Sequence, residues 1–242
     1  MGPGQAWLGF LCFCFTDAPG AAVTNNRLDI DAPLQALFVL RMQEMGAMPQ
    51  PAPPRAWRAV KADRELRVSA SPDGWSDAVF RDMKARDIEV VCTVPDGGLT
   101  PLLKMVEADR GLRLVTLSTE EEGIGIATGC WLGGKRAMIA MQSSGVGNCI
   151  NALGLPTALR APCLMLVTMR GQWGEFNPWQ VPMGQAVKPA LEAVGVRCFS
   201  VDKPAEVAET FIAAADIAFN SRVSAAVLIS QRVIGAKGFG QK

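Results

Sequence analysis

The chain has 242 residues, of which 49% are hydrophobic and 19% charged, enough to bury the core of one domain with an appendage. Its net charge of +1 gives no electrostatic reason to expect nucleic acid as a partner, and no apolar run reaches the length of a membrane-spanning helix. Histidine is absent, which excludes Ser-His-Asp and Cys-His catalysis and metal binding by histidine. Proton transfer must therefore use carboxylates, lysine, cysteine or a cofactor.

The first 70 residues show no sustained hydrophobic period. Residues 6–15 resemble the apolar part of a signal peptide but lack the basic residues that precede one, and residues 48–54 are proline-rich, as in a linker. We expect residues 1–70 to be a poorly ordered extension and residues 71–242 to form the domain. The chain has 7 cysteines and no C-x-x-C pair, which indicates small core residues in a reducing cytoplasm.

From residue 71 onward, helix and strand patterns alternate. The predicted helices cover residues 75–86, 99–107, 120–132, 147–159, 184–194 and 204–219, and the predicted strands cover residues 88–94, 112–117, 136–141, 163–168, 196–201 and 225–230. The strands are continuous apolar runs, so both faces of the sheet should be covered. The pattern predicts an α/β fold with a doubly wound, mostly parallel six-stranded sheet and helices on both faces. Ligands of such sheets bind beyond the carboxyl ends of the strands, so the loops after residues 94, 117, 141 and 168 are the candidate site.

The loop after residue 117 leads into a helix that begins with three glutamates, Glu120 to Glu122. Acidic residues in a first helical turn are stabilised by the helix dipole, which is an ordinary structural role. The helix then carries Gly123, Gly125 and Gly129, although each glycine inside a helix costs about 1 kcal/mol relative to alanine. This composition predicts that other groups approach the helix backbone closely.

The loop after residue 141 is also rich in glycine and could hold a phosphate at a helix start. As a dinucleotide-binding fingerprint it fails, because Ile150 stands where the last glycine of G-x-G-x-x-G is needed. No G-x-x-x-x-G-K-[ST] motif is present. These failures argue against a flavodoxin-like nucleotide-binding protein.

The loop that follows residue 168 is long, extending from Arg170 to Gly184 in the sequence. Loops of this length inside a compact domain are usually functional or disordered, and two tryptophans and a phenylalanine are not typical of disorder. We therefore interpret it as a binding or interface loop.

Taken together, the motifs of these loops resemble the pyrimidine-binding α subunits of thiamine diphosphate-dependent 2-oxoacid decarboxylases, of the sulfopyruvate or phosphonopyruvate type. The matching segments are residues 94–96 (VPD), 119–127 (TEEEGIGIA), 141–148 (MQSSGVGN), 170–171 (RG), 174–175 (GE) and 180–184 (QVPMG). Their order and spacing match across residues 75–235. The resemblance implies the pyrimidine domain of the thiamine diphosphate-binding fold, with the cofactor held between two domains.

The resemblance also implies roles for individual residues. The family uses one glutamate against the aminopyrimidine ring of the cofactor, and this residue corresponds to Glu120. A second set corresponds to the family's loop against the same ring; it comprises Gln142, Ser144, Gly145 and Asn148. The family commonly has asparagine where this chain has Ser143, which weakens any role for that side chain.

Two further residues are candidate substrate contacts. Asp96 stands at a strand end and could contact the substrate or act as an acid, or could simply form the turn. Arg170 could receive the anionic tail of the substrate, or could pair with Glu175.

The family's diphosphate-binding domain carries a Gly-Asp-Gly motif that helps to hold Mg²⁺, and this motif is absent here. The resemblance therefore implies that thiamine diphosphate is shared with a β subunit, that Mg²⁺ is held by that partner and not by this chain, and that the two chains form a hetero-oligomer. The predicted function is the α subunit of a cytoplasmic decarboxylase that converts a small anionic 2-oxoacid to an aldehyde and CO₂. The sequence does not separate sulfopyruvate from phosphonopyruvate. The alternative is a non-catalytic pyrimidine-domain binding or regulatory module.

Overall fold

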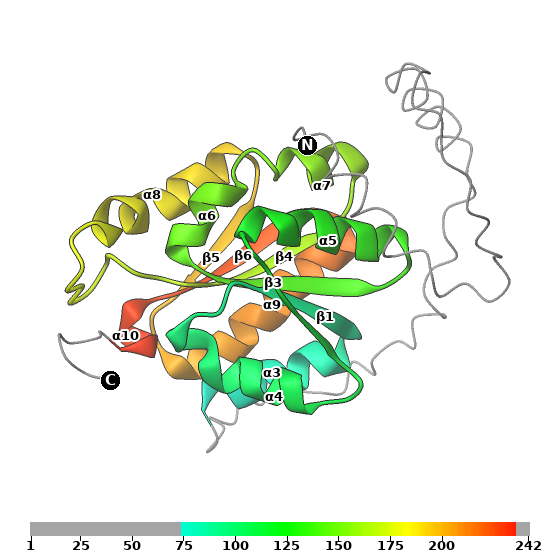
Figure 1. The fold of residues 1–242 in the computed structure, drawn as a ribbon, viewed down its shortest axis with the longest axis horizontal. Helices are drawn as coiled ribbons and strands as arrows, with labels where there is room; N and C mark the ends of the chain where they lie inside the picture. The colour runs from blue at the N-terminus through cyan, green and yellow to red at the C-terminus, as the bar shows by residue number, and fades with distance from the viewer. Residues whose placement is uncertain (1–73, 236–242) are drawn as a thin grey trace, which may run out of the picture. The chain divides into compact units, whose positions relative to one another are not determined.

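A computed structural model of the chain describes residues 74–235, which belong to one compact unit (Figure 1). The strands are β1 (Ile88–Thr93), β2 (Arg113–Thr116), β3 (Arg136–Gln142), β4 (Cys163–Thr168), β5 (Arg197–Val201) and β6 (Ser224–Ile229). The α-helices are α3 (Trp75–Ala85), α4 (Thr100–Ala108), α5 (Glu120–Leu132), α6 (Ser143–Cys149), α7 (Gly154–Leu159), α8 (Gln180–Ala193), α9 (Val207–Ser221) and α10 (Gln231–Ile234), with 3₁₀ turns η1 (Gly97–Leu99) and η2 (Pro204–Glu206). The extension predicted for residues 1–70 lies outside the described residues.

The six strands form one sheet in the order β2-β1-β3-β4-β6-β5, and every neighbouring pair is parallel. The predicted six-stranded doubly wound sheet is therefore confirmed. The chain passes from β1 outward to β2 and then returns to β3 on the other side of β1, so the winding direction reverses between β1 and β3. A reversal of this kind leaves a crevice at the carboxyl ends of the two strands, where ligands of doubly wound folds bind.

Helices cover both faces of the sheet, as the apolar strands predicted. Figure 1 shows α3, α4 and α9 on one face and α5, α6, α7 and α8 on the other. Successive residues of a strand point to opposite faces of the sheet, so each face has its own apolar core. Leu164 and Leu166 of β4 pack into one core, and Met165 and Val167 pack into the other. No helix among residues 74–235 is long and apolar enough to cross a membrane.

The predicted helix over residues 147–159 is wrong in its bounds, because two helices occupy this region. Helix α6 begins at Ser143 and ends at Cys149, and α7 runs from Gly154 to Leu159. Pro156 has no amide hydrogen, so it fits the first turn of a new helix, whereas inside a continuous helix it would remove a backbone hydrogen bond. Pro182 lies likewise in the first turn of α8, which begins at Gln180, four residues before the predicted start.

Candidate active site at the carboxyl edge of the sheet

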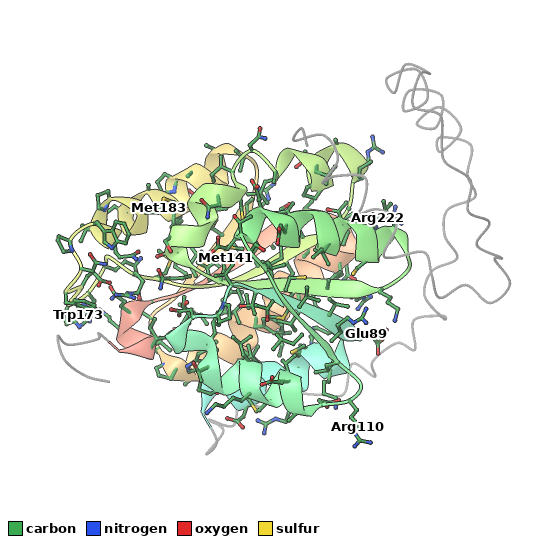
Figure 2. The ribbon with its side chains drawn as sticks, viewed as in Figure 1. Glu89, Arg110, Met141, Trp173, Met183 and Arg222 are labelled. Atoms are coloured by element: carbon green, nitrogen blue, oxygen red, sulfur yellow. The ribbon has the colours of Figure 1, made fainter. Side chains whose placement is uncertain are left out.

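The predicted site residues follow the carboxyl ends of four parallel strands. Asp96 follows β1, Glu120 follows β2, Gln142 ends β3 and Arg170 follows β4. Met141, the residue before Gln142, lies where β3 passes into α6 (Figure 2). Hydrogen bonds join these residues into three groups, around Glu120, around Asp96 and around Arg170.

Glu120 is the first residue of α5 and is buried, with 8% of its surface exposed. The amide Nδ2 of Asn148 on α6 donates to its Oε2 at 2.9 Å. Gly145, also on α6, lies against the same carboxylate, since a Cβ added to Gly145 would stand 2.3 Å from the carboxyl carbon of Glu120. Two of the residues that were assigned to one site from the sequence, Gly145 and Asn148, therefore do contact the predicted catalytic glutamate.

The three consecutive glutamates have different environments. Glu121 is exposed, whereas Glu122 accepts a hydrogen bond from the backbone N–H of Ser118 at 2.9 Å. That bond satisfies a free donor before the start of α5 and is a structural role. Glu120 is the glutamate of the three whose carboxylate is buried against another helix.

The glycines of α5 serve in part to bring the helix onto the sheet. A Cβ at Gly123 would lie 3.0 Å from Leu117 and 3.2 Å from Ile139, so glycine permits the close approach at this point. A Cβ at Gly125 would meet nothing within 4 Å. The predicted close approach to the helix backbone is thus found at Gly123, where the neighbouring groups belong to this chain.

A second group is built around the carboxylate of Asp96. Its Oδ2 accepts from the backbone N–H of Gly98 and from the hydroxyl of Thr168, both at 2.9 Å, and its Oδ1 accepts from Nε2 of Gln142 at 2.9 Å. Gln142 Oε1 in turn accepts from the hydroxyl of Ser144 at 2.7 Å. The turn-forming role that the sequence left open is present, and the same carboxylate also ties together the ends of β1, β3 and β4.

The third group holds the loop after β4. Arg170 pairs with Glu175 through two hydrogen bonds, from Nε at 2.7 Å and from Nη2 at 2.6 Å, and both side chains are buried. Glu175 also accepts from Nε2 of Gln231 at 2.9 Å, and Gln231 Oε1 accepts from the backbone N–H groups of Gln172 and Trp173 at 2.9 Å. The pairing with Glu175 that the sequence left open for Arg170 is the one present.

Gln231 was missed by the sequence analysis. It is 1% exposed at the start of α10, yet its only signal in the sequence was a polar residue directly after the last strand. The loop that it helps to hold presents large apolar side chains to solvent, with Trp173 52% exposed and Trp179 75% exposed. Trp173 lies at the outer end of the loop (Figure 2), with the guanidinium of Arg232 3.8 Å from its ring centre.

The pKa of Glu175 predicts how this loop responds to acid. Hydrogen bonds from Arg170, and then those from the backbone of Asn177 and Gly171, outweigh the effect of burial and lower the pKa of Glu175 from 4.5 to about 2. A carboxyl whose pKa is lower in the folded state stabilises the fold above its unfolded pKa and loses that contribution as the pH falls toward the folded value. We expect the stabilising contribution of the Glu175 carboxylate to be lost between about pH 4.5 and pH 2.

The measurement is urea unfolding of the wild type and of Glu175→Gln across this pH range. The variant should be less stable at pH 7, and the difference should shrink as the pH falls. A difference that stays constant from pH 7 to pH 3 would contradict a lowered pKa of Glu175 in the folded protein.

Known proteins share segments of this sequence and this fold. The family described as thiamine pyrophosphate enzyme, N-terminal TPP binding domain, matches residues 75–176. A solved structure of a 2-oxoglutarate:ferredoxin oxidoreductase from Magnetococcus marinus has the same fold, with a TM-score of 0.55 and 19% identity over 66% of this chain and 29% of that one.

Closer relatives narrow the class. The chain is 34% identical over 155 residues to the sulfopyruvate decarboxylase subunit alpha of Methanococcus maripaludis and covers 93% of it. It is 37% identical over 155 residues to the same subunit of Methanothermobacter thermautotrophicus and covers 94% of it; both alignments span 64% of this chain. The chain belongs to the family of sulfopyruvate decarboxylase α subunits, which confirms the resemblance drawn from the loop motifs.

A longer relative matches this chain over a small part of its own length. The phosphonopyruvate decarboxylase of Streptomyces hygroscopicus is 39% identical over 89 residues, which is 36% of this chain and 22% of that protein.

Proposed function

We propose that this chain is the α subunit of a two-subunit thiamine diphosphate-dependent decarboxylase, which converts sulfopyruvate or phosphonopyruvate to the corresponding aldehyde and CO₂. The observation that carries this proposal is Glu120, a buried carboxylate that begins the helix between β2 and β3 of a doubly wound sheet. Among the described residues, Asn148 donates a hydrogen bond to Oε2 of this carboxylate. The other oxygen, Oε1, therefore has acceptor capacity for a bound ligand.

The residues present fit thiamine diphosphate. Glu120 would contact the pyrimidine ring, with Gly145 leaving room for the carboxylate of Glu120 itself and Asn148 holding that carboxylate in place. Gln142 and Ser144 complete the proposed cofactor-binding set at the end of β3. When bound, thiamine diphosphate supplies the electron sink that permits loss of CO₂ from a 2-oxoacid.

For the two candidate substrate contacts, the hydrogen bonds favour positioning roles. Asp96 already accepts from three donors within the chain, and Arg170 has two of its donors on Glu175. We therefore propose that Asp96 holds the ends of β1, β3 and β4 in place, and that Arg170 fixes the conformation of the loop after β4.

The proposed partner is a β subunit that carries the diphosphate half of the site and Mg²⁺, so that the active site forms between chains of a hetero-oligomer. Two observations support it. The relatives that this chain covers almost completely are named as α subunits, whereas it covers 31% of the protein named sulfopyruvate decarboxylase in Methanosarcina acetivorans. We place the complex in the cytoplasm, in line with the reduced thiols of Cys149, Cys163 and Cys198.

Reconstitution tests this proposal. The chain, mixed with a subunit that carries a diphosphate-binding domain, should release CO₂ from sulfopyruvate or phosphonopyruvate only when both chains, thiamine diphosphate and Mg²⁺ are present. The controls are each chain alone and the complex without cofactor, and comparison of kcat/KM ranks the two substrates. Binding of the partner without turnover of either substrate, and without cofactor binding by calorimetry, would support the alternative of a non-catalytic module.

A further inference from the structure

The hydrogen bonds around Asp96 run in one direction through three side chains. Asp96 Oδ1 accepts from Nε2 of Gln142 at 2.9 Å, and Oε1 of Gln142 accepts from the hydroxyl of Ser144 at 2.7 Å. An ionised carboxylate can only accept hydrogen bonds, so the amide of Gln142 must turn its NH₂ group toward Asp96. Its carbonyl oxygen is then directed to Ser144, whose hydroxyl donates its single proton to it.

Ser144, at the other end of this series of hydrogen bonds, is exposed. It is the residue directly before Gly145, which lies against Glu120. A hydroxyl has one proton and two lone pairs, and the proton of Ser144 is already committed to Gln142. Ser144 therefore offers an acceptor, and not a donor, to any group that contacts it.

We propose that Asp96 is a positioning residue that acts through Gln142 to hold Ser144 as a hydrogen-bond acceptor, and that the group bound at Ser144 is an N–H or O–H donor. This inference rests on the proposed function. The fully ionised 2-oxoacid substrates carry acceptor groups only, so for them the donor comes either from the amino group of the cofactor's pyrimidine ring or from a side chain of the partner subunit.

Replacing Asp96 by asparagine reverses the chain of hydrogen bonds without changing its shape. The backbone N–H of Gly98 can only donate and does so to Oδ2, so asparagine is expected to keep its oxygen there and to turn its NH₂ group toward Gln142. The amide of Gln142 must then rotate, its NH₂ group donates to Ser144, and Ser144 becomes a donor toward the site. We expect Asp96→Asn to lower kcat/KM of the two-chain enzyme by about ten- to a hundredfold, as for the loss of one or two polar contacts.

Exchanging the carboxylate of residue 96 and the amide of residue 142 should restore the direction of the hydrogen bond to Ser144. In Gln142→Glu alone, two carboxylates face each other and activity should fall at least as far. In Asp96→Asn with Gln142→Glu, asparagine donates to the new carboxylate, which accepts again from Ser144, and kcat/KM should return to within about threefold of the wild type, a difference below 1 kcal/mol. A purely structural turn residue gives the opposite pattern, a mild single variant and a double variant that sums the two defects.

Asp109 provides a matched control. It also accepts from the backbone N–H of the glycine two residues later, Gly111, at 2.8 Å, but it lies before β2, away from the carboxyl edge of the sheet. Asp109→Asn should leave kcat/KM unchanged. Asp96→Asn with wild-type kinetics, or a double variant no better than Asp96→Asn, would overturn the proposal.

Two further measurements separate the sources of the donor and the failure of the proposed function. Loss of affinity in Ser144→Ala for thiamine diphosphate, but not for its analogue with an oxo group in place of the amino group, assigns the donor to the cofactor. Weaker assembly of the two chains without cofactor assigns the donor to the partner. A Ser144→Ala variant that changes neither measurement overturns a donor at Ser144.

If the wild-type complex does not decarboxylate, the proposed function fails. Urea unfolding of the two single variants and the double variant still tests the pairing of Asp96 with Gln142. Unfolding midpoints that are lowered in both single variants and restored in the double variant support it, whereas additive losses overturn it.

Discussion

Glu120→Gln is expected to abolish decarboxylation by the assembled two-chain enzyme while leaving the fold intact. Glutamine has the same shape, and its carbonyl oxygen can still accept the hydrogen bond that Asn148 donates at 2.9 Å. What it lacks is a carboxylate that can share a proton with a ring nitrogen. Loss of a proton-transfer group lowers rates by about 10²- to 10⁴-fold, so turnover should fall to the limit of detection. The measurements are kcat by CO₂ release and the urea unfolding midpoint.

The neighbouring glutamates are the matched controls for this substitution. Glu121→Gln removes the same charge from an exposed position and should keep wild-type turnover. Glu122→Gln weakens the hydrogen bond to the backbone N–H of Ser118 and should affect stability by about 1 kcal/mol or less, with turnover kept. An active Glu120→Gln enzyme together with an inactive Glu121→Gln enzyme would move the catalytic assignment by one residue.

Gly145→Ala is expected to have an effect of similar size by a steric route. The added Cβ would lie 2.3 Å from both the carboxyl carbon and Oε1 of Glu120, well inside van der Waals contact. Either the carboxylate of Glu120 leaves its position or α6 moves away from α5, and both changes remove the carboxylate from the ligand. We expect turnover to fall by at least about 10²-fold and the fold to lose about 1–3 kcal/mol from overpacking.

Gly147→Ala on the same helix separates the steric clash from a general effect on α6. A Cβ there would lie 3.3 Å from the sulfur of Met183, at the flexible end of a long side chain that can shift. This variant should keep most of its turnover and its cofactor affinity by calorimetry. Wild-type kinetics for Gly145→Ala would show that Glu120 does not work from the position seen here.

Much of the fold was predictable from local patterns in the sequence. The continuous apolar runs of the strands, such as residues 163–168, predicted a sheet covered on both faces, because each face of a strand needs apolar side chains where helices pack on it. Helix bounds were less predictable where the pattern was weak. Glycines at 145 and 147 obscured the start of α6, and the break before α7 was recognisable only from the position of Pro156.

The candidate site was predictable to the level of loops. Parallel strands end at one edge of a sheet, so motifs that follow different strands had to meet there, and the resemblance to a known family named Glu120 among three adjacent glutamates. Sequence patterns could not show which of the three is buried, because that depends on α6 crossing the start of α5 and bringing Asn148 from 28 residues away. They could not decide between substrate contact and internal pairing for Arg170 either.

The sequence by itself therefore determined the class of fold and the edge of the sheet that carries the candidate site, since these follow from hydrophobic period and strand direction. The tertiary structure alone decided which of the side chains there pair with one another. Glu175 meets Gln231 across 56 residues and Asp96 meets Thr168 across 72, and no local pattern encodes such contacts. The direction of a hydrogen bond depends on what each partner already donates or accepts, so the acceptor role inferred for Ser144 emerges only once Asp96, Gln142 and Ser144 are seen together.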